Sequence, residues 1–336
     1  DALDLCLSCK GCSRDCPTGV DMAAYKSEIL HQKYKGKLRP PSHYALGQLP
    51  RVARITPPGF ANAMMKSKFV GRLMKAGAGV DQRRHLPLFS TRRFRKNSPK
   101  VDQPDVWIWA DSFTDCFAAD AGRDAVALLE GQGLKVGVIA EPACCGLTWI
   151  TTGQLDAARR IVGKSVEMLH PYVTSGVPVI ALEPSCLAAM REDATQLLDD
   201  PRAAEVGKGI KSLAEFLLER NYQPPKLAGR QIVVQPHCHQ HAVIGFESDL
   251  ALLKATGADV VRLGGCCGLA GNFGVEKGHY ETSVAIAQHQ LLPAIAAAGS
   301  DAIVVADGFS CRTQVHDLSD ARVITMAQLF AGRADG

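Results

Sequence analysis

Four cysteines near the start of the chain have the spacing of an iron site. The run reads Cys-x2-Cys-x2-Cys-x3-Cys-Pro, and its members are Cys6, Cys9, Cys12 and Cys16. Thiolates spaced in this way hold [4Fe–4S] clusters, because each can reach a neighbouring iron of one cubane. A four-cysteine zinc site, which prefers two separated pairs, is the structural alternative. The run leaves open whether Cys16 closes this cluster or serves another one.

The other eight cysteines form two sets with matched spacing. The first set is Cys116, Cys144, Cys145 and Cys186, and the second is Cys238, Cys266, Cys267 and Cys311. In both sets the first cysteine precedes a Cys-Cys-Gly-Leu sequence by 28 positions. We interpret the match as a duplicated unit. Each set could hold an iron–sulfur cluster or a zinc ion, and buried free cysteines are the structural alternative.

Alternating strand-like and helix-like segments surround these cysteines. The predicted strands are Val106–Ala110, Val136–Ala140, Val177–Leu182, Gln231–Val234, Val260–Leu263 and Ala302–Ala306. Helical segments between them indicate βαβ units with parallel sheets. Each cysteine loop follows a predicted strand, and the loops after parallel strands gather at one edge of the sheet. We therefore expect three distant segments to converge on one site in each unit.

The predicted fold class is α/β, with a small helical [4Fe–4S] domain followed by two repeated βαβ domains with parallel sheets. We expect the helical domain and a basic linker at residues 1–100, and the two repeats at 101–225 and 226–336. The helical domain should contain a helix at Met22–Tyr34 capped by Asp21. The boundary between the repeats is expected near Pro224–Gly229. The segment His279–Ala298 is predicted to be helical.

Charge is distributed unevenly along the chain. Residues 1–100 carry 20 Lys and Arg against 6 Asp and Glu, a balance of +14, whereas the remainder carries 18 against 28, a balance of −10. The dense basic stretch from Arg83 to Lys100 is interpreted as a linker or a docking surface for an acidic partner or anionic lipid. No nucleic-acid-binding signature accompanies it. No apolar stretch approaches the roughly 18 residues of a membrane helix, and the cysteine grouping indicates a reducing compartment.

Three polar residues beside the second cysteine set are candidate cofactor contacts. His237 and His239 flank Cys238, and either could donate a hydrogen bond to a cluster sulfur. Arg312 follows Cys311 and could offset the charge of a cluster. The first set has no such histidines and is expected to be the weaker or emptied copy.

Several motifs together resemble a known family. The segments "EPACCGL" (141–147), "EPSC" (183–186), "GGCCGLAGNFGVE" (264–276) and "DGFSCRTQ" (307–314) are similar to the twin cysteine-rich CCG domains of heterodisulfide reductase and of the glycolate oxidase iron–sulfur subunit. With "CLSCKGCSRDCPTGVDMAAYKSEIL" (6–30) in front, the chain resembles the C-terminal iron–sulfur part of an FAD-linked D-2-hydroxyacid dehydrogenase. The family pattern ends in Cys-x-x-Cys, whereas here Gln314 stands three residues after Cys311.

This resemblance implies a function and partners. It implies an oxidoreductase module with at least one [4Fe–4S] cluster, and room for a second at a CCG site. The module would pass electrons from an FAD-containing domain or subunit, absent here, to a quinone or carrier protein. The chain alone is expected not to be catalytic. We expect no nucleic-acid partner, an oligomer, and a cytoplasmic location, with a peripheral contact on the inner face of the membrane left open. The alternatives are a thiol/disulfide reductase of the heterodisulfide reductase type and a zinc-binding assembly module.

Overall fold

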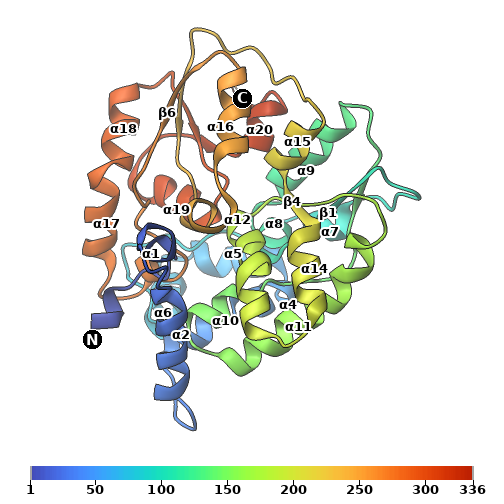
Figure 1. Cartoon of the computed structure of the whole chain (residues 1–336). Helices are drawn as coiled ribbons and strands as arrows, with labels where there is room; N and C mark the ends of the chain where they lie inside the picture. The colour runs from blue at the N-terminus through green and yellow to red at the C-terminus, as the bar shows by residue number, and fades with distance from the viewer. Residues whose placement is uncertain (1, 335–336) are drawn as a thin grey trace.

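Two four-stranded parallel sheets form the centre of the structure (Figure 1), which is a computed structural model describing residues 2–334. The first unit has the strand order β2-β1-β3-β4, and the second unit has the order β6-β5-β7-β8. Every neighbouring pair of strands is parallel. The two units therefore share one topology, and the predicted fold class of repeated βαβ units with parallel sheets is confirmed.

The six predicted strands are present, and each sheet has one strand more than predicted. The first unit contains β1 (Val106–Trp109), β2 (Val136–Val138), β3 (Val179–Ala181) and β4 (Ile210–Ser212). The second unit contains β5 (Gln231–Val234), β6 (Asp259–Arg262), β7 (Ile303–Val305) and β8 (Val323–Ile324). The additional strands, β4 and β8, lead directly into capping boxes, in which Ser212 pairs with Glu215 and Thr325 with Gln328.

Helices cover both sheets. The first unit contains α8 (Ser112–Cys116), α9 (Ala119–Glu130), α10 (Leu147–Thr151), α11 (Leu155–Val173), α12 (Pro184–Ala188), η2 (Ala189–Asp193), α13 (Ala194–Leu197), α14 (Pro201–Gly209) and α15 (Leu213–Glu219). The second unit contains η3 (Gln240–Ile244), α16 (Glu247–Ala255), η4 (Phe273–Val275), α17 (Tyr280–His289), α18 (Leu291–Ala298), α19 (Phe309–Leu318) and α20 (Met326–Phe330). The segment His279–Ala298, predicted to be helical, consists of the two helices α17 and α18. Pro293 cannot donate to the carbonyl of His289, so the chain breaks at Gln290.

Short helices form the N-terminal region. They are η1 (Ala2–Leu5), α1 (Gly11–Asp15), α2 (Met22–Lys33), α3 (Pro41–Ala45), α4 (Leu49–Ile55), α5 (Pro58–Lys66), α6 (Lys68–Gly77) and α7 (Phe94–Asn97). The predicted cap of α2 is confirmed, because Asp21 accepts hydrogen bonds from the backbone N–H groups of Ala23 and Ala24. Prolines occupy the first turn of α3, α4 and α5, where the missing N–H has no helical partner to lose.

The two units share an apolar core. Buried leucines of α15, α16 and α20, namely Leu217, Leu252 and Leu329, belong to one cluster. The N-terminal region contacts both units, because α1 lies against η3 of the second unit and α2 lies against α10 and α11 of the first. The cysteine run is thus held between the two sheets' loop regions. The division at residues 225 and 226 stays a prediction.

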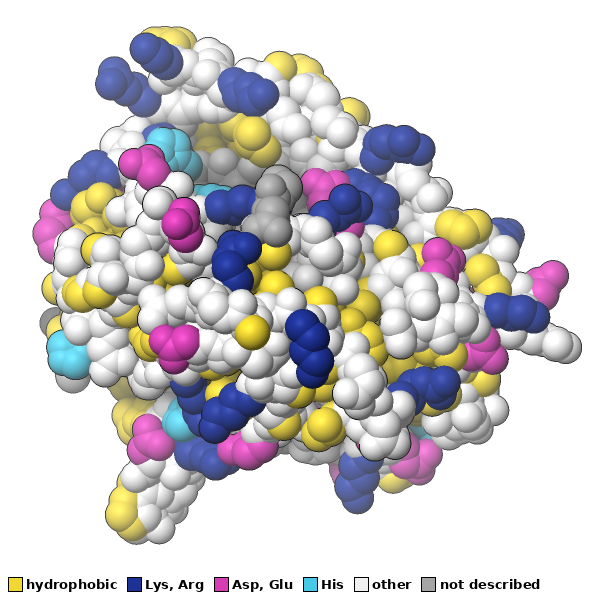
Figure 2. All heavy atoms as spheres, turned by 90° about the horizontal axis from the view of Figure 1, so that it is seen from above, with side chains coloured by type: hydrophobic (Ala, Val, Ile, Leu, Met, Phe, Trp, Pro, Cys, Tyr) yellow, Lys and Arg dark blue, Asp and Glu magenta, His cyan; other side chains and the backbone are white. Residues whose placement is uncertain are grey.

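Figure 2 shows one face of the molecule, on which Lys and Arg are interspersed with Asp, Glu and apolar areas. Within residues 2–334, the structure has no helix with the length and apolar character needed to cross a bilayer.

Three arginines of the basic stretch from Arg83 to Lys100 make contacts inside the protein. Arg84 and Arg93 are buried. The Arg93 guanidinium donates to three backbone carbonyls of residues 53–56. Arg95 donates to the carbonyl of Ala140 and pairs with Asp115. Arg83, Arg92, Lys96 and Lys100 are exposed, so the interpretation of this stretch as a linker or docking surface stays a prediction that can rest only on these four residues.

Candidate metal centre

The second unit brings its four cysteines together. Cys238 follows β5, Cys266 and Cys267 follow β6, and Cys311 lies in the first turn of α19 after β7. The Sγ atoms of Cys238 and Cys266 are 3.4 Å apart. Hydrogen bonds from Cys266 and Cys311 hold the pKa of the buried Cys267 thiol well below its usual range. The four sulfurs thus form one continuous row.

Backbone N–H groups point at this row. The N–H of Gly268 donates to Cys266 Sγ at 3.3 Å. Further N–H groups, from Leu269 and Ala270, help to lower the pKa of Cys267. Gly268 has a φ of +89°, and a Cβ there would lie 2.2 Å from the carbonyl oxygen of Ser283. The glycine after the cysteine pair is therefore required by both conformation and space. Donors of this kind stabilise anionic, sulfur-ligated clusters.

Cys9 of the N-terminal run joins the same row. A hydrogen bond to Cys238 lowers the pKa of Cys9 to about 6 against the opposing effect of burial. Ser8 and Lys10 on either side of Cys9 both adopt left-handed conformations, with φ of 56° and 60°. Such backbone is uncommon outside glycine and persists only where surrounding contacts hold it.

Those contacts come from both units. Lys10 is almost fully buried, and its Nζ lies 2.8 Å from Asp193, 3.0 Å from Asp21 and 3.2 Å from Glu192. The carboxylates of Asp193 and Asp21 raise the pKa of Lys10, although burial alone would lower it. His239 Nε2 lies 3.0 Å from the carbonyl oxygen of Ser8. Cys9 is thus fixed by the first unit through Lys10 and by the second through His239.

The other cysteines of the run have separate partners. The N–H of Met22 donates to Cys12 Sγ at 3.3 Å. Cys16 Sγ lies 3.1 Å from the hydroxyl of Thr18, and this hydrogen bond lowers the pKa of Cys16 to about 7. Lys26 Nζ donates to the carbonyl of Cys6 at 2.6 Å. The positions of Cys6, Cys12 and Cys16 as ligands of a shared cluster stay predictions.

The first unit assembles three sulfurs instead of four. Cys145 Sγ and Cys186 Sγ are 3.1 Å apart, and Cys145 also bonds to Cys144. All three are buried. Cys116 lies elsewhere, in an apolar cluster with Ala53, Ala61 and Phe89. Burial raises the pKa of Cys116 to about 11, so this thiol is protonated at neutral pH.

The register of the sheets explains the position of Cys116. Trp109 lies opposite Ala181, which in turn pairs with the capping residue Ser212. In the second unit the corresponding capping residue is Thr325, directly after the β8 residue that pairs with Val305. If Ser212 and Thr325 are taken as equivalent, their neighbours on the adjacent strands, Ala181 and Ala306, are equivalent too. Cys186 and Cys311 each follow these alanines at the same distance in the sequence, so they also align.

The same register gives the counterpart of Cys238. Since Val234 pairs with Val305, Gln235 takes the place of Trp109. Asp111 and His237 each lie two residues after this equivalent pair, and Ser112 and Cys238 each lie three residues after it. Asp111 therefore corresponds to His237, and Ser112 corresponds to Cys238. Cys116 is one helical turn beyond that position, so the equal spacing of 28 residues does not align the two copies. Ser112 instead forms a hydrogen bond with Cys144.

A large apolar cavity opens beside the row of sulfurs. Its volume is about 270 Å³. One end is lined by Cys9, His237, Cys238 and His239. The remaining wall is mostly apolar and comes from α4, α5, α6 and both units; it includes Leu49, Val52, Met65, Met74, Phe113 and Phe309. A hydrophobic molecule in this cavity would lie against Cys238.

Comparison with known proteins bears on both units. Residues 112–191 and 246–316 match the family model of the cysteine-rich domain CCG. Each unit thus contains one segment that matches this model. We call the two units the first and the second CCG domain.

Several curated proteins of similar sequence are dehydrogenases or dehydrogenase subunits. The chain is 28% identical over 291 residues to a subunit of the anaerobic glycerol-3-phosphate dehydrogenase of Escherichia coli strain K12, covering 80% of this chain and 72% of that protein. It is 25% identical over 338 residues to D-2-hydroxyglutarate dehydrogenase of Pantoea ananatis, covering 94% of this chain but only 32% of the relative. Lactate utilization protein A of Oceanobacillus iheyensis is 25% identical over 184 residues. The chain therefore spans about a third of the hydroxyglutarate dehydrogenase.

The polar residues expected to support the second CCG domain have other partners. His237 Nε2 lies 3.2 Å from the hydroxyl of Ser310, and burial lowers the pKa of His237 to about 3, so the ring is neutral. Arg312 donates to the carbonyls of Ala306 and Asp307 at the end of β7. His239 Nδ1 is buried without a hydrogen-bond partner among the described residues. The side chain of His239 lines the apolar cavity.

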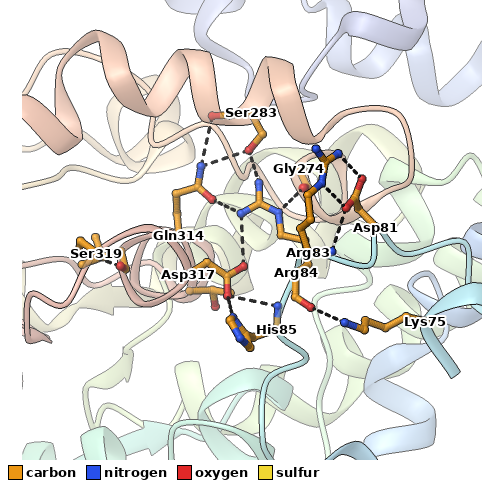
Figure 3. Close-up of polar contacts among 12 residues, drawn as sticks. Lys75, Asp81, Arg83, Arg84, His85, Gly274, Ser283, Gln314, Asp317 and Ser319 are labelled. Atoms are coloured by element: carbon orange, nitrogen blue, oxygen red, sulfur yellow. Dashed lines mark hydrogen bonds and ion pairs between the residues drawn. The ribbon is translucent and has the colours of Figure 1, made fainter. Parts of the chain in front are cut away.

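Gln314 stands at the position of the last cysteine in the family pattern, and its side chain forms hydrogen bonds inside the protein (Figure 3). Its side-chain oxygen accepts a hydrogen bond of 2.7 Å from the fully buried Arg84. Arg84 also donates to Ser283 Oγ and to the carbonyl of Gly274, and it pairs with Asp317 at 3.3 Å. The residues before α7 are thereby fixed to the second CCG domain. Sequence reasoning missed Arg84, because a single Arg in a basic stretch gives no sign of burial.

The cysteines of the second unit are the residues that would hold an iron–sulfur group. Across residues 2–334, no group of three or more His, Cys, Asp or Glu side chains is placed to hold a metal ion. The thiols that bind one cluster contact different irons, and metal binding deprotonates the thiol. Cys238, Cys266, Cys267 and Cys311 would supply these thiols, and His239 lines the neighbouring cavity.

Proposed function

We propose that this chain is the iron–sulfur electron-transfer module of a flavin-dependent D-2-hydroxyacid dehydrogenase. An iron–sulfur cluster bound by these thiolates supplies one-electron transfer. The observation that carries the proposal is that Cys9 and Cys238 line the same end of one cavity. This places the ferredoxin-type run beside the second CCG domain, which supports a path for electrons through both sets of thiols.

The chain's own residues would hold this path in place. Lys10 and His239 fix the loop that carries Cys9, and Gly268 lets the backbone approach Cys266 closely. Donation by backbone N–H groups and burial of the sulfurs are the means by which a protein sets a cluster potential. The three buried sulfurs of the first CCG domain, with Ser112 at the fourth position, support its role as the weaker or emptied copy.

The electron donor would be a flavoprotein, either a domain of the same protein or a separate polypeptide. The similarity to D-2-hydroxyglutarate dehydrogenase, of which this chain spans about a third, supports this assignment. The acceptor that best suits the site is a quinone. The cavity beside Cys9 and Cys238 is mostly apolar, so it favours a hydrophobic acceptor over a charged disulfide substrate.

Metal content and electron transfer test the proposal together. The protein, reconstituted anaerobically with iron and sulfide, should bind iron and acid-labile sulfide in equal amounts, with little zinc. The reduced protein should show the EPR signal of a [4Fe–4S] cluster and should accept electrons from a reduced flavoprotein. Stoichiometric zinc without sulfide would support the assembly module instead and would refute the electron-transfer assignment.

A further inference from the structure

A continuous part of the chain combines positive charge with exposed apolar side chains. Residues 29–80 contain ten Lys and Arg and no Asp or Glu. Of the thirteen large apolar side chains that are exposed among the described residues, twelve lie between Leu5 and Leu88. Both CCG domains together contribute one, Leu218. The exposed apolar surface is therefore concentrated on the N-terminal helices.

Helices α4, α5 and α6 carry the most exposed of these residues. Ile55 is 76% exposed at the end of α4, and Phe60 is 64% exposed in the first turn of α5. Phe69 and Leu73 are 79% and 66% exposed, and their spacing of four residues places them on the same side of α6. Val52 of α4 is also exposed. We call these five residues the apolar face.

The three helices form one structural group. Ala53 of α4 and Ala61 of α5 are buried in the same small core, and α5 packs against α6. Met65 of α5 and Met74 of α6 line the apolar cavity, and Val52 of α4 belongs both to the cavity wall and to the apolar face. The group thus borders the cavity beside Cys238 and also exposes the apolar face to solvent.

Cations surround the apolar face. Arg51, Lys66, Lys68 and Arg72 are exposed. In contrast, Arg54 and Lys75 donate to backbone carbonyls and are not available to a partner. A solvent-exposed apolar strip flanked by Lys and Arg is the pattern of helices that lie in the interface of an anionic membrane.

We propose that α4–α6 bind to the surface of an anionic lipid bilayer through the apolar face and its four flanking cations. Protein interfaces are depleted in Lys at their centre, and an acidic protein partner would not require five exposed large apolar residues between the cations. A bilayer satisfies both features at once, because headgroups neutralise the cations while acyl chains receive the apolar side chains.

This inference rests on the proposed electron-transfer function. Binding at the bilayer surface would place the cavity beside the lipid, in which a hydrophobic acceptor dissolves. It can be tested without any electron transfer. The purified holoprotein is sedimented with vesicles of phosphatidylcholine, with or without roughly 30% phosphatidylglycerol, at low and high salt. Binding is expected only with the anionic lipid, and it should weaken at high salt.

Two variants address the two features separately. The double substitution Phe69→Glu/Leu73→Glu should abolish vesicle binding. The triple substitution Lys66→Gln/Lys68→Gln/Arg72→Gln should weaken it by about a hundredfold, at about 1 kcal/mol for each cation. The matched controls are Leu218→Glu and Lys208→Gln/Lys254→Gln/Lys277→Gln, which change exposed residues of the CCG domains. These controls should bind vesicles like the wild type.

Iron content and the unfolding midpoint are measured for every variant, so that loss of folding is not mistaken for loss of binding. Wild-type protein that ignores anionic vesicles would overturn the proposal. So would Phe69→Glu/Leu73→Glu protein that still binds vesicles but no longer forms a complex with the flavoprotein, because the apolar face would then be a protein interface. Neither result would alter the electron-transfer assignment, which depends on the cysteines.

Discussion

Cys238 Sγ lies 3.4 Å from Cys266 Sγ, although the two residues follow different strands and are 28 positions apart in the sequence. The parallel sheet β6-β5-β7 causes this approach, since the carboxyl ends of its strands open on one edge. Cys311 reaches the same edge after β7. The row of sulfurs is therefore a consequence of topology as much as of local sequence.

The first prediction concerns which cysteines hold iron. Cys238→Ala should remove iron from the second CCG domain, because it interrupts the row of sulfurs. Cys9→Ser should remove the ferredoxin-type cluster and also disturb the signal of the second CCG domain, because Cys9 bonds to Cys238. Iron determination and EPR of the reduced proteins measure both effects.

Cys116→Ala is the matched control for these two variants. Cys116 packs against Ala53 and Phe89, away from the other cysteines of the first CCG domain. The substitution should leave the iron content unchanged. Loss of iron from this variant would show that Cys116 is a ligand. It would also contradict the alignment in which Ser112, and not Cys116, is the counterpart of Cys238.

A second prediction concerns catalysis by the chain alone. The isolated chain should bind no stoichiometric FAD and should not oxidise D-lactate or D-2-hydroxyglutarate. The reason is that its sequence offers no dinucleotide fingerprint after a strand. The measurement is an anaerobic assay with a dye acceptor on the flavin-free chain. Substrate-dependent dye reduction would contradict the assignment as an electron-transfer module.

The cavity gives a third prediction. Met65→Trp adds a bulky side chain to the cavity wall and should slow electron transfer to a short-chain quinone. Ferricyanide accepts electrons at the protein surface, so its reduction should change little. The ratio of the two rates, measured after reduction by the flavoprotein, reports on the cavity. Equal slowing of both acceptors would indicate damage to the iron site and not to a quinone site.

The sequence patterns predicted most of the strands and the duplication correctly. They did not predict which residues of the two copies are equivalent. Apolar runs such as Val106–Trp109 and Ile303–Val305 are long enough to be recognised, whereas β8 has only two residues. The equal spacing from Cys116 and from Cys238 suggested equivalent cysteines. Only the hydrogen-bonded register shows that α8 carries Cys116 one turn beyond the equivalent position.

Burial of charge was also invisible in the sequence. Arg83 and Arg84 are neighbours in the same basic stretch, yet Arg84 is fully buried and Arg83 is about half exposed. The difference depends on acceptors from Gly274, Ser283 and Gln314, which are about 190 or more positions away. Such long-range contacts depend on how the domains pack. Local sequence patterns do not predict that packing.

These two arginines provide the fourth prediction. Arg84→Met should lower the free energy of unfolding by roughly 3–5 kcal/mol, because it leaves Asp317 and the acceptors around it without their buried donor. Arg83→Met removes a cation that pairs with Asp81 and Glu281 largely at the surface, so it should cost about 1 kcal/mol or less. Urea unfolding of the two variants under the same conditions gives the comparison. Similar losses in both would argue against a buried anchoring role for Arg84.

The last prediction concerns pH and the N-terminal helices. His43 of α3 is buried against Tyr34, and burial lowers the pKa of His43 from its usual 6.5 to about 4, with Arg39 adding to the effect. Between these values the unfolded chain binds a proton that the folded protein does not. Stability should therefore decline as the pH falls from 6.5 toward 4, and should be unaffected by this group above 6.5.

The variant His43→Phe retains the aromatic contact with Tyr34 and removes the titrating group. Its unfolding midpoint in urea should fall less between pH 7 and pH 5 than that of the wild type. If His43→Phe and wild-type protein lose stability equally over this range, the acid sensitivity arises elsewhere, and a neutral buried His43 is not what limits the stability of the N-terminal helices.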